Sequence, residues 1–91
     1  MKEQDIKDLG FRRVDVSPEE AGDDIGFYYY IYDIIQHMSL ITSSNDEAVK
    51  EGEWIVEIFD VGEGLEFKQK EDVRAFIDLI EKNKKIRNNG K

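Results

Sequence analysis

The stretch "FYYYIYDIIQHMSLIT", residues 27–42, decides the fold because it reads as two strands joined by a short turn. Residues 27–35 and 39–43 are rich in tyrosine, isoleucine and other residues that favour β-structure. The intervening "QHM" is short enough for a hairpin. We therefore expect an antiparallel sheet in which residues 27–35 form a central strand.

Alternation divides residues 27–35 into two faces, of which one is apolar and the other amphipathic. One face carries Tyr28, Tyr30, Tyr32 and Ile34; the other carries Phe27, Tyr29, Ile31 and Ile35, with Asp33 interrupting. We expect the Phe27, Tyr29 and Ile31 side to form the core, which leaves the tyrosine ladder (Tyr28, Tyr30 and Tyr32) on an open face. A tyrosine ladder of this kind is either a half-solvated sheet face or a contact surface for a partner.

The flanking sequence supplies further strands and the helices that cover the sheet. Strands are expected at residues 11–17, 54–61 and 65–68, with a tight "GEG" turn at 62–64. Helices are expected near residues 2–9 and 71–84, and short helical turns at 17–22 and 44–51, where Ser17 with Glu20 and Ser44 with Glu47 have the capping-box spacing. The last helix has apolar residues at the i, i+3, i+4, i+7 positions from Val73 to Ile80.

These elements predict a single α+β domain over residues 1–86. An antiparallel meander of four to five strands is covered on one face by the C-terminal amphipathic helix and the short N-terminal helix. Residues 87–91 are expected to be a frayed basic tail. The 91 residues leave no room for a second domain.

Charge is unevenly distributed along the chain, whose net charge is −8. Residues 82–91 hold five of the 13 basic residues and no acid, so residues 1–81 carry 8 basic and 21 acidic residues, or −13. Such an acidic body repels nucleic acid and anionic membrane and attracts basic protein surfaces. There is no secretory signal and no apolar run of membrane-spanning length, so we expect a cytoplasmic protein.

Residues typical of catalytic or metal sites are scarce. The chain has no cysteine, and its one histidine, His37, has no serine in a nucleophile-elbow setting nearby. The "GEG" motif precedes a strand rather than a helix and is therefore a turn, not a dinucleotide site. No calcium-loop pattern occurs. We expect no enzyme activity, cofactor or specific metal site.

Two groups of side chains are candidates for contacting a protein partner. They are the tyrosine ladder and the acidic residues Glu19, Glu20, Asp23, Asp24, Glu57, Asp60, Glu63 and Glu66, the last four of which would continue a row from Glu51 and Glu53. Tyrosines among carboxylates suit a partner that presents arginines. The strand at 27–35 contains no basic residue, which disfavours direct binding of nucleic acid bases.

Three markers, "VDVSPEE", "FYYY" and "WIVEIF", give residues 9–84 a distinctive pattern. This pattern resembles that of small uncharacterised proteins found in Bacteroidota genomes and their phages. The resemblance implies a mobile-element or phage setting, with the host cytoplasm as location, and it assigns no functional residue.

The leading hypothesis is a non-enzymatic acidic interaction module, such as a phage or mobile-element inhibitor of a nucleic-acid-handling host or defence protein, of the anti-CRISPR or DNA-mimic type. One alternative is nucleic-acid binding through the basic tail (Lys82, Lys84, Lys85, Arg87 and Lys91). Another is self-association into a homodimer, through the ladder or an unpaired edge strand. A small enzyme would require a pocket around His37 with several carboxylates.

Overall fold

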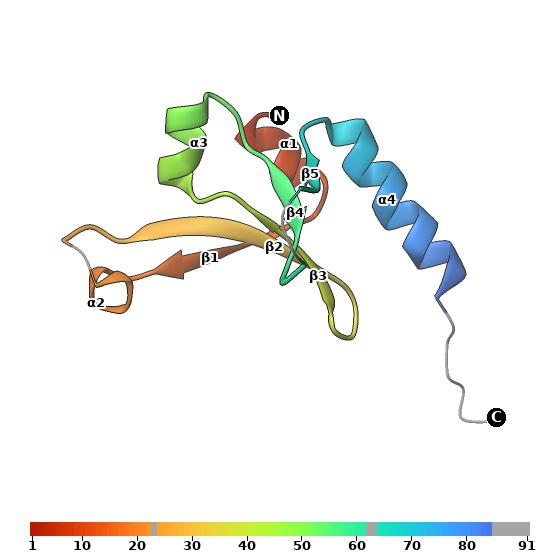
Figure 1. Cartoon of the computed structure of the whole chain (residues 1–91), viewed down its shortest axis with the longest axis horizontal. Helices are drawn as coiled ribbons and strands as arrows, with labels where there is room; N and C mark the ends of the chain where they lie inside the picture. Colours follow the sequence, from red (N-terminus) through yellow and green to blue (C-terminus); the bar gives the residue numbers. More distant parts are fainter. Residues whose placement is uncertain (23, 62–63, 85–91) are drawn as a thin grey trace.

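The computed structural model describes residues 1–22, 24–61 and 64–84. Its elements along the chain are α1 (Glu3–Asp8), β1 (Arg12–Val16), α2 (Pro18–Ala21), β2 (Phe27–Ile35), β3 (Met38–Thr42), α3 (Asn45–Glu51), β4 (Val56–Ile58), β5 (Glu66–Phe67) and α4 (Lys70–Asn83). In Figure 1, α1, α3 and α4 gather on one side of the long β2 ribbon, while α2 lies at the far end of the β1–β2 hairpin. The predicted α+β class is confirmed.

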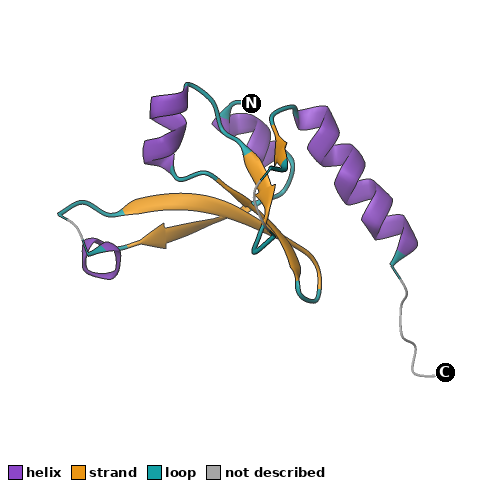
Figure 2. Cartoon of the chain, in the orientation of Figure 1, coloured by secondary structure: helices purple, strands orange, loops and turns teal. Residues whose placement is uncertain are grey.

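The strands of the described residues form one five-stranded sheet in the order β1-β2-β3-β4-β5, and every neighbouring pair is antiparallel. This is the expected meander (Figure 2). The last two strands are shorter than the sequence predicts. The expected strand at 54–61 contributes only three paired residues, and the one at 65–68 only two. Trp54 instead anchors the start of β4 in the core, and Gly62 and Glu63 of the expected turn lie outside the described residues.

The end of α1 follows the helix-stop signal in the sequence. Gly10 adopts the left-handed conformation at φ 96°. The Gly10 N–H donates to the Lys7 carbonyl, and the Phe11 N–H donates to the Ile6 carbonyl, as in a Schellman motif. Phe11 is thereby folded back into the core beside Ile6, so this turn directs the chain from α1 into the edge strand β1.

Both predicted capping boxes are present. Ser17 and Glu20 cap α2 through reciprocal side chain to backbone bonds of 3.3 and 3.1 Å. Ser44 and Glu47 cap α3 in the same way, at 3.3 and 3.2 Å. Each box typically contributes about 1 kcal/mol to the helix it starts. Glu47 is thus held at the first turn of α3, next to the end of β3.

The buried apolar side chains form one cluster between the sheet and the helices. Its members are Ile6, Leu9, Phe11, Tyr30, Ile34, Leu40, Ala48, Trp54, Val56, Val73 and Ile77. Leu40 and Val56 from the middle strands are fully buried, as are Ile6 of α1 and Val73 of α4. The helices therefore cover the sheet face to which Tyr30 belongs.

The expected assignment of sheet faces is wrong. Tyr30 is only 3% exposed, and Tyr28 and Tyr32 are half-buried against the core cluster. Phe27, Tyr29 and Ile31, which were expected to form the core, are half-buried on the opposite face of β2. The partners of β2 across the sheet explain this outcome.

Candidate protein-binding surface

The tyrosine ladder belongs to an aromatic cluster beneath the helices. The Tyr30 ring lies 5.6 Å from the Trp54 ring and 6.1 Å from the Tyr28 ring, in both cases nearly edge-on. Tyr32 packs against Phe11 at 5.3 Å. Burial removes Tyr30 from any contact surface, and it leaves Tyr28 and Tyr32 only partly accessible. The ladder is thus mainly structural.

The arginine that the ladder was expected to attract is present in the chain itself. The Arg13 guanidinium lies 3.7 Å above the centre of the Tyr28 ring, a cation–π arrangement. The same guanidinium is paired with Asp15 two residues along β1, at 2.8 Å. This side of Tyr28 is therefore already occupied within the molecule.

Tyr30 ends in a polar contact with α1. Its hydroxyl donates a 2.7 Å hydrogen bond to Glu3 Oε2, so the buried ring has a satisfied polar tip. Burial, reinforced by the Glu3 carboxylate, raises the pKa of Tyr30 to about 12. Burial likewise raises the pKa of Tyr28. The folded state therefore favours the neutral form of Tyr28 and Tyr30.

These shifts predict a loss of stability at high pH. In the unfolded chain a tyrosine ionises near pH 10, whereas Tyr30 in the folded chain resists ionisation until about pH 12. The Tyr30 contribution is complete below pH 10 and disappears as the pH rises to 12, a loss of about 2–3 kcal/mol. Urea unfolding between pH 8 and 12 will measure it. Tyr30→Phe is the control, because this variant retains the ring and should show a smaller decline; an equal decline would contradict the assignment.

The opposite face of the sheet carries an apolar surface that we call the open face. It consists of Val14, Val16, Phe27, Tyr29, Ile31 and Ile41, all half-buried, and the register places them side by side on β1, β2 and β3. The buried side chains of α1, α3 and α4 belong to the core cluster on the other face, and α2 has no buried side chain. The described helices therefore leave the open face uncovered.

The cross-strand partners show why the two faces differ. Ile31 is paired with Ile41, which is paired in turn with Glu57 of β4 and then Glu66 of β5. Carboxylates thus end the open face. On the other face Tyr32 is paired with Leu40, whose next partner is Ile58, so that row is apolar throughout. The helices bury the face to which this uncharged row belongs.

Two adjoining grooves run along the open face and meet at Glu47. One, of about 380 Å³, is lined by Phe27, Tyr29, Ile41, Thr42, Ser44 and Glu47. The other, of about 410 Å³, is lined by Ser43, Glu47, Lys50, Glu51, Ile55, Glu57, Glu66 and Lys68. The first groove is mainly apolar, and the second gathers four carboxylates with two lysines. An apolar groove beside an acidic one suits a protein segment with apolar and basic residues.

At the Asp33 end of the open face, the carboxylate is paired with neighbouring side chains. Asp33 accepts a 2.6 Å hydrogen bond from the Ser39 hydroxyl and a 3.4 Å bond from Arg12. The Ser39 bond, followed by that of Arg12, lowers the pKa of Asp33. At the β4–β5 end Glu57 and Glu66 are both exposed, and they share their groove with Lys50 and Lys68.

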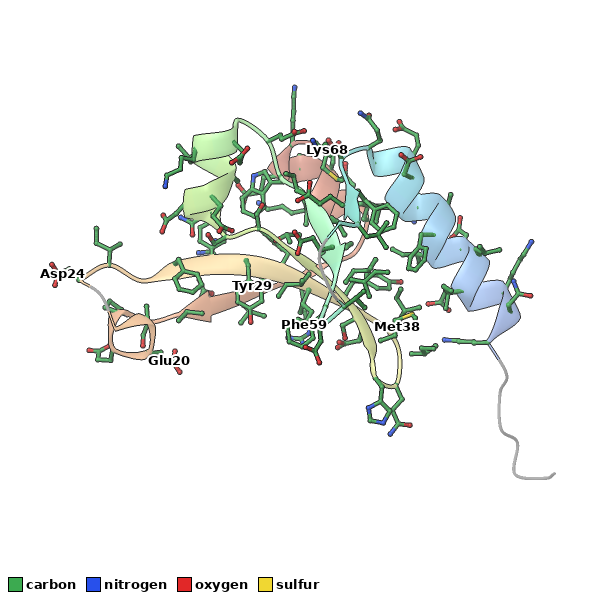
Figure 3. The ribbon with its side chains drawn as sticks, viewed as in Figure 1. Glu20, Asp24, Tyr29, Met38, Phe59 and Lys68 are labelled. Carbon is green, nitrogen blue, oxygen red and sulfur yellow. The ribbon has the colours of Figure 1, made fainter. Side chains whose placement is uncertain are left out.

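The predicted acidic contact residues do not form one row. Glu57 and Glu66 are direct cross-strand neighbours, as the row requires. Glu53 is turned to the N-terminus, where it accepts from the Met1 ammonium at 3.4 Å. Glu19 and Glu20 belong to α2 and lie with Asp24 at the far end of the molecule; Figure 3 labels Glu20 and Asp24 there. Asp23 and Glu63 lie outside the described residues.

His37 and Asp60 occupy two turns at the same end of the sheet. Both have left-handed backbone conformations, at φ 68° and 65°, and they line a shallow hollow with Ser39 and Phe59. Among the described residues that line it, Asp60 is the only carboxylate. Within residues 1–22, 24–61 and 64–84, no group of three or more acidic or histidine side chains could hold a metal ion.

The basic tail falls largely beyond the described part of the chain. Lys82 lies in the last turn of α4, and Lys84, the C-cap residue, is paired with Glu81 at 3.0 Å. Lys85, Arg87 and Lys91 lie outside the described residues. The tail therefore adds no described surface to the open face.

Comparisons with known proteins find no family model, curated protein or solved structure that matches this chain. The resemblance to small Bacteroidota and phage proteins consequently stays a prediction. No helix in the described ranges is both long enough and apolar enough to cross a membrane.

Proposed function

We propose that this chain is a non-enzymatic interaction module that binds a basic protein surface through its open face. The observation that carries the proposal is the division of the sheet. One face is buried by α1, α3 and α4. The other face carries apolar side chains on β1, β2 and β3, and the carboxylates of Glu57 and Glu66 border this apolar surface. Apolar centres with a charged rim are the usual anatomy of protein–protein interfaces.

The charge of the molecule selects the class of partner. The chain has a net charge of −8, and Glu57, Glu66 and Glu51 lie together at one end of the open face. A basic partner is attracted over several ångströms and is oriented so that its cations reach these carboxylates. Proteins that handle nucleic acid expose such basic surfaces. We therefore propose a nucleic-acid-handling protein as the partner, and inhibition of it as the effect, in keeping with the phage setting that the sequence resemblance implies.

The acids do not support full mimicry of nucleic acid. Lys50 and Lys68 line the same groove as the carboxylates, and other acids lie on α1, α2 and α4. A mimic needs carboxylates in ordered rows without interleaved cations. The proposal is accordingly limited to recognition by an apolar face with an acidic border.

Site-specific photo-crosslinking tests the proposal. Tyr29 on the open face and Val49 on α3, which is 83% exposed, would each be replaced by p-benzoylphenylalanine in the full chain. In a lysate of the source cell, we expect the position-29 variant alone to crosslink to a basic, nucleic-acid-handling protein, with a yield that falls as salt rises. Crosslinking to the same protein from position 49 only, or to no basic protein at low salt, would contradict the proposal.

A further inference from the structure

The edge strand β1 presents a hydrogen-bonding edge to solvent. It is the first strand in the sheet order and pairs only with β2 among the strands of the described residues. We propose that β1 pairs with β1 of a second copy of this chain, antiparallel, across a two-fold axis at Val14. This inference concerns an edge of the sheet and does not rest on the proposed function of the open face.

The direction of the free backbone groups on β1 follows from β2. The Tyr30 N–H donates to Thr42 Oγ1 at 3.0 Å, so the backbone groups of Tyr30 point toward β3. Tyr28 behaves in the same way, since its N–H donates to Asn45 Oδ1 at 2.8 Å. The residues opposite them on β1 are Arg13 and Asp15. At such non-hydrogen-bonded positions both strands turn their backbone groups away from each other, so those of Arg13 and Asp15 point to the free edge.

With a two-fold axis at Val14, the backbone N–H and C=O groups of Arg13 and Asp15 all form hydrogen bonds with the second copy. It places Arg13 opposite Asp15 of the second copy, and Asp15 opposite Arg13 of the second copy. Each of these positions is a narrow hydrogen-bonded pair, so the two strands exchange four backbone hydrogen bonds. Val14 meets Val14 of the second copy at the axis, on the same side of the sheet as Tyr29.

The side chains of β1 favour this register over its neighbours. With the axis at Val14, Arg13 and Asp15 form two cross-strand ion pairs between the copies, and opposite charges directly across an antiparallel pair are stabilising. With the axis at Arg13 or at Asp15, two like charges would instead face each other across the axis. Within one copy, Arg13 Nε already donates to Asp15 Oδ1 at 2.9 Å, which leaves the second carboxylate oxygen for the other copy.

The same pairing would extend the sheet and join the two open faces. Val14 and Val16 lie at the β1 border of the open face, so the apolar surface would continue from one copy into the other. A strand of five residues buries less than the roughly 1,200 Å² of a stable interface, so the dimer is expected to be weak. It should therefore appear only as the concentration rises.

Charge exchange tests this register directly. The full chain has a mass of 10.6 kDa, and sedimentation velocity up to about 1 mM should show its weight-average mass rising toward twice that value. Arg13→Asp and Asp15→Arg each place like charges at both cross-strand positions, and each should weaken dimerisation about tenfold or more. An equal mixture of the two variants restores Asp opposite Arg at both positions, so the mixture should dimerise as the unmodified chain does.

The controls separate this pairing from a general effect on folding. Arg13→Lys and Asp15→Glu preserve the charges and should dimerise within about twofold of the unmodified chain. Circular dichroism verifies that every variant is folded. The proposal is overturned if the unmodified chain remains at 10.6 kDa throughout the concentration range. It is equally overturned if the single variants dimerise normally, or if mixing them restores nothing.

Discussion

Replacing Tyr30 by alanine is expected to lower the free energy of unfolding by about 3–5 kcal/mol, as for other buried aromatic residues. The Tyr30 ring is 3% exposed, contacts the rings of Tyr28 and Trp54, and ends in a hydrogen bond to Glu3. Its removal leaves a cavity at the centre of the core and an aromatic cluster without its middle member. A domain of this size has only about 5–10 kcal/mol of stability, so the variant should be close to unfolding.

The adjacent Tyr29→Ala substitution is the matched control. Tyr29 lies on the same strand but on the open face, where it is half-buried and the centre of its ring is 6.5 Å from that of Phe27. We expect a cost of about 1 kcal/mol, from lost β-propensity and partial burial. Urea denaturation of both variants supplies the comparison. Equal costs, or a larger cost at Tyr29, would mean that the helices do not cover the Tyr30 face.

Introducing a lysine on the open face is expected to reduce partner binding at least about tenfold. Ile31→Lys places a cation at the centre of the apolar surface, opposite Ile41 of β3 and two strands from Glu57 of β4. A basic partner then meets a like charge and a desolvated ammonium where it requires an apolar contact. The partner identified by crosslinking, titrated against the purified chain by calorimetry, gives the dissociation constants.

Two further substitutions distinguish a contact effect from a loss of structure. Val49→Lys adds the same charge to α3 at a position 83% exposed and away from the open face, and it should change affinity less than about twofold. Ile31→Thr preserves β-branching without adding charge, and its effect should be intermediate. Comparable weakening by Val49→Lys would show that net charge, rather than the open face, controls binding.

The elements of the fold were predictable because their signals are local. Gly10 marks the end of α1, and the serine–glutamate spacings begin α2 and α3. A short turn between two β-rich segments requires the β2–β3 hairpin. Short connections then favour an antiparallel meander over crossovers. Each of these inferences depends on residues within one turn or one hairpin.

The use of the two sheet faces was not predictable from β2 alone. Both sides of that strand carry several large apolar side chains, so these side chains alone do not decide which side the helices bury. The decision comes from neighbours in the sheet, because Leu40 continues one face and Glu57 ends the other. Asp33, on the Tyr29 side, was the one local signal for solvent, and it pointed to the face that is open.

The candidate contact residues were only partly predictable for the same reason. Glu57 and Glu66 are nine positions apart in sequence, and the β4–β5 pairing brings them together. Glu47, which joins the two grooves, was recognised only as a helix cap. The sequence alone did not show that Arg13 and Asp15 lie on an edge strand, because this requires the strand order, in which β1 is first.

The central claim is that the helices bury the Tyr30 face and leave the Tyr29 face open to a partner. Solvent paramagnetic relaxation of the side-chain methyl groups, with a soluble gadolinium chelate, tests it most directly in the intact protein. We predict strong relaxation at Val14, Ile31 and Ile41 and weak relaxation at Leu40, Val56 and Val73, which are buried. Strong relaxation at Leu40 and Val56, with protection of Ile31 and Ile41, would contradict the account.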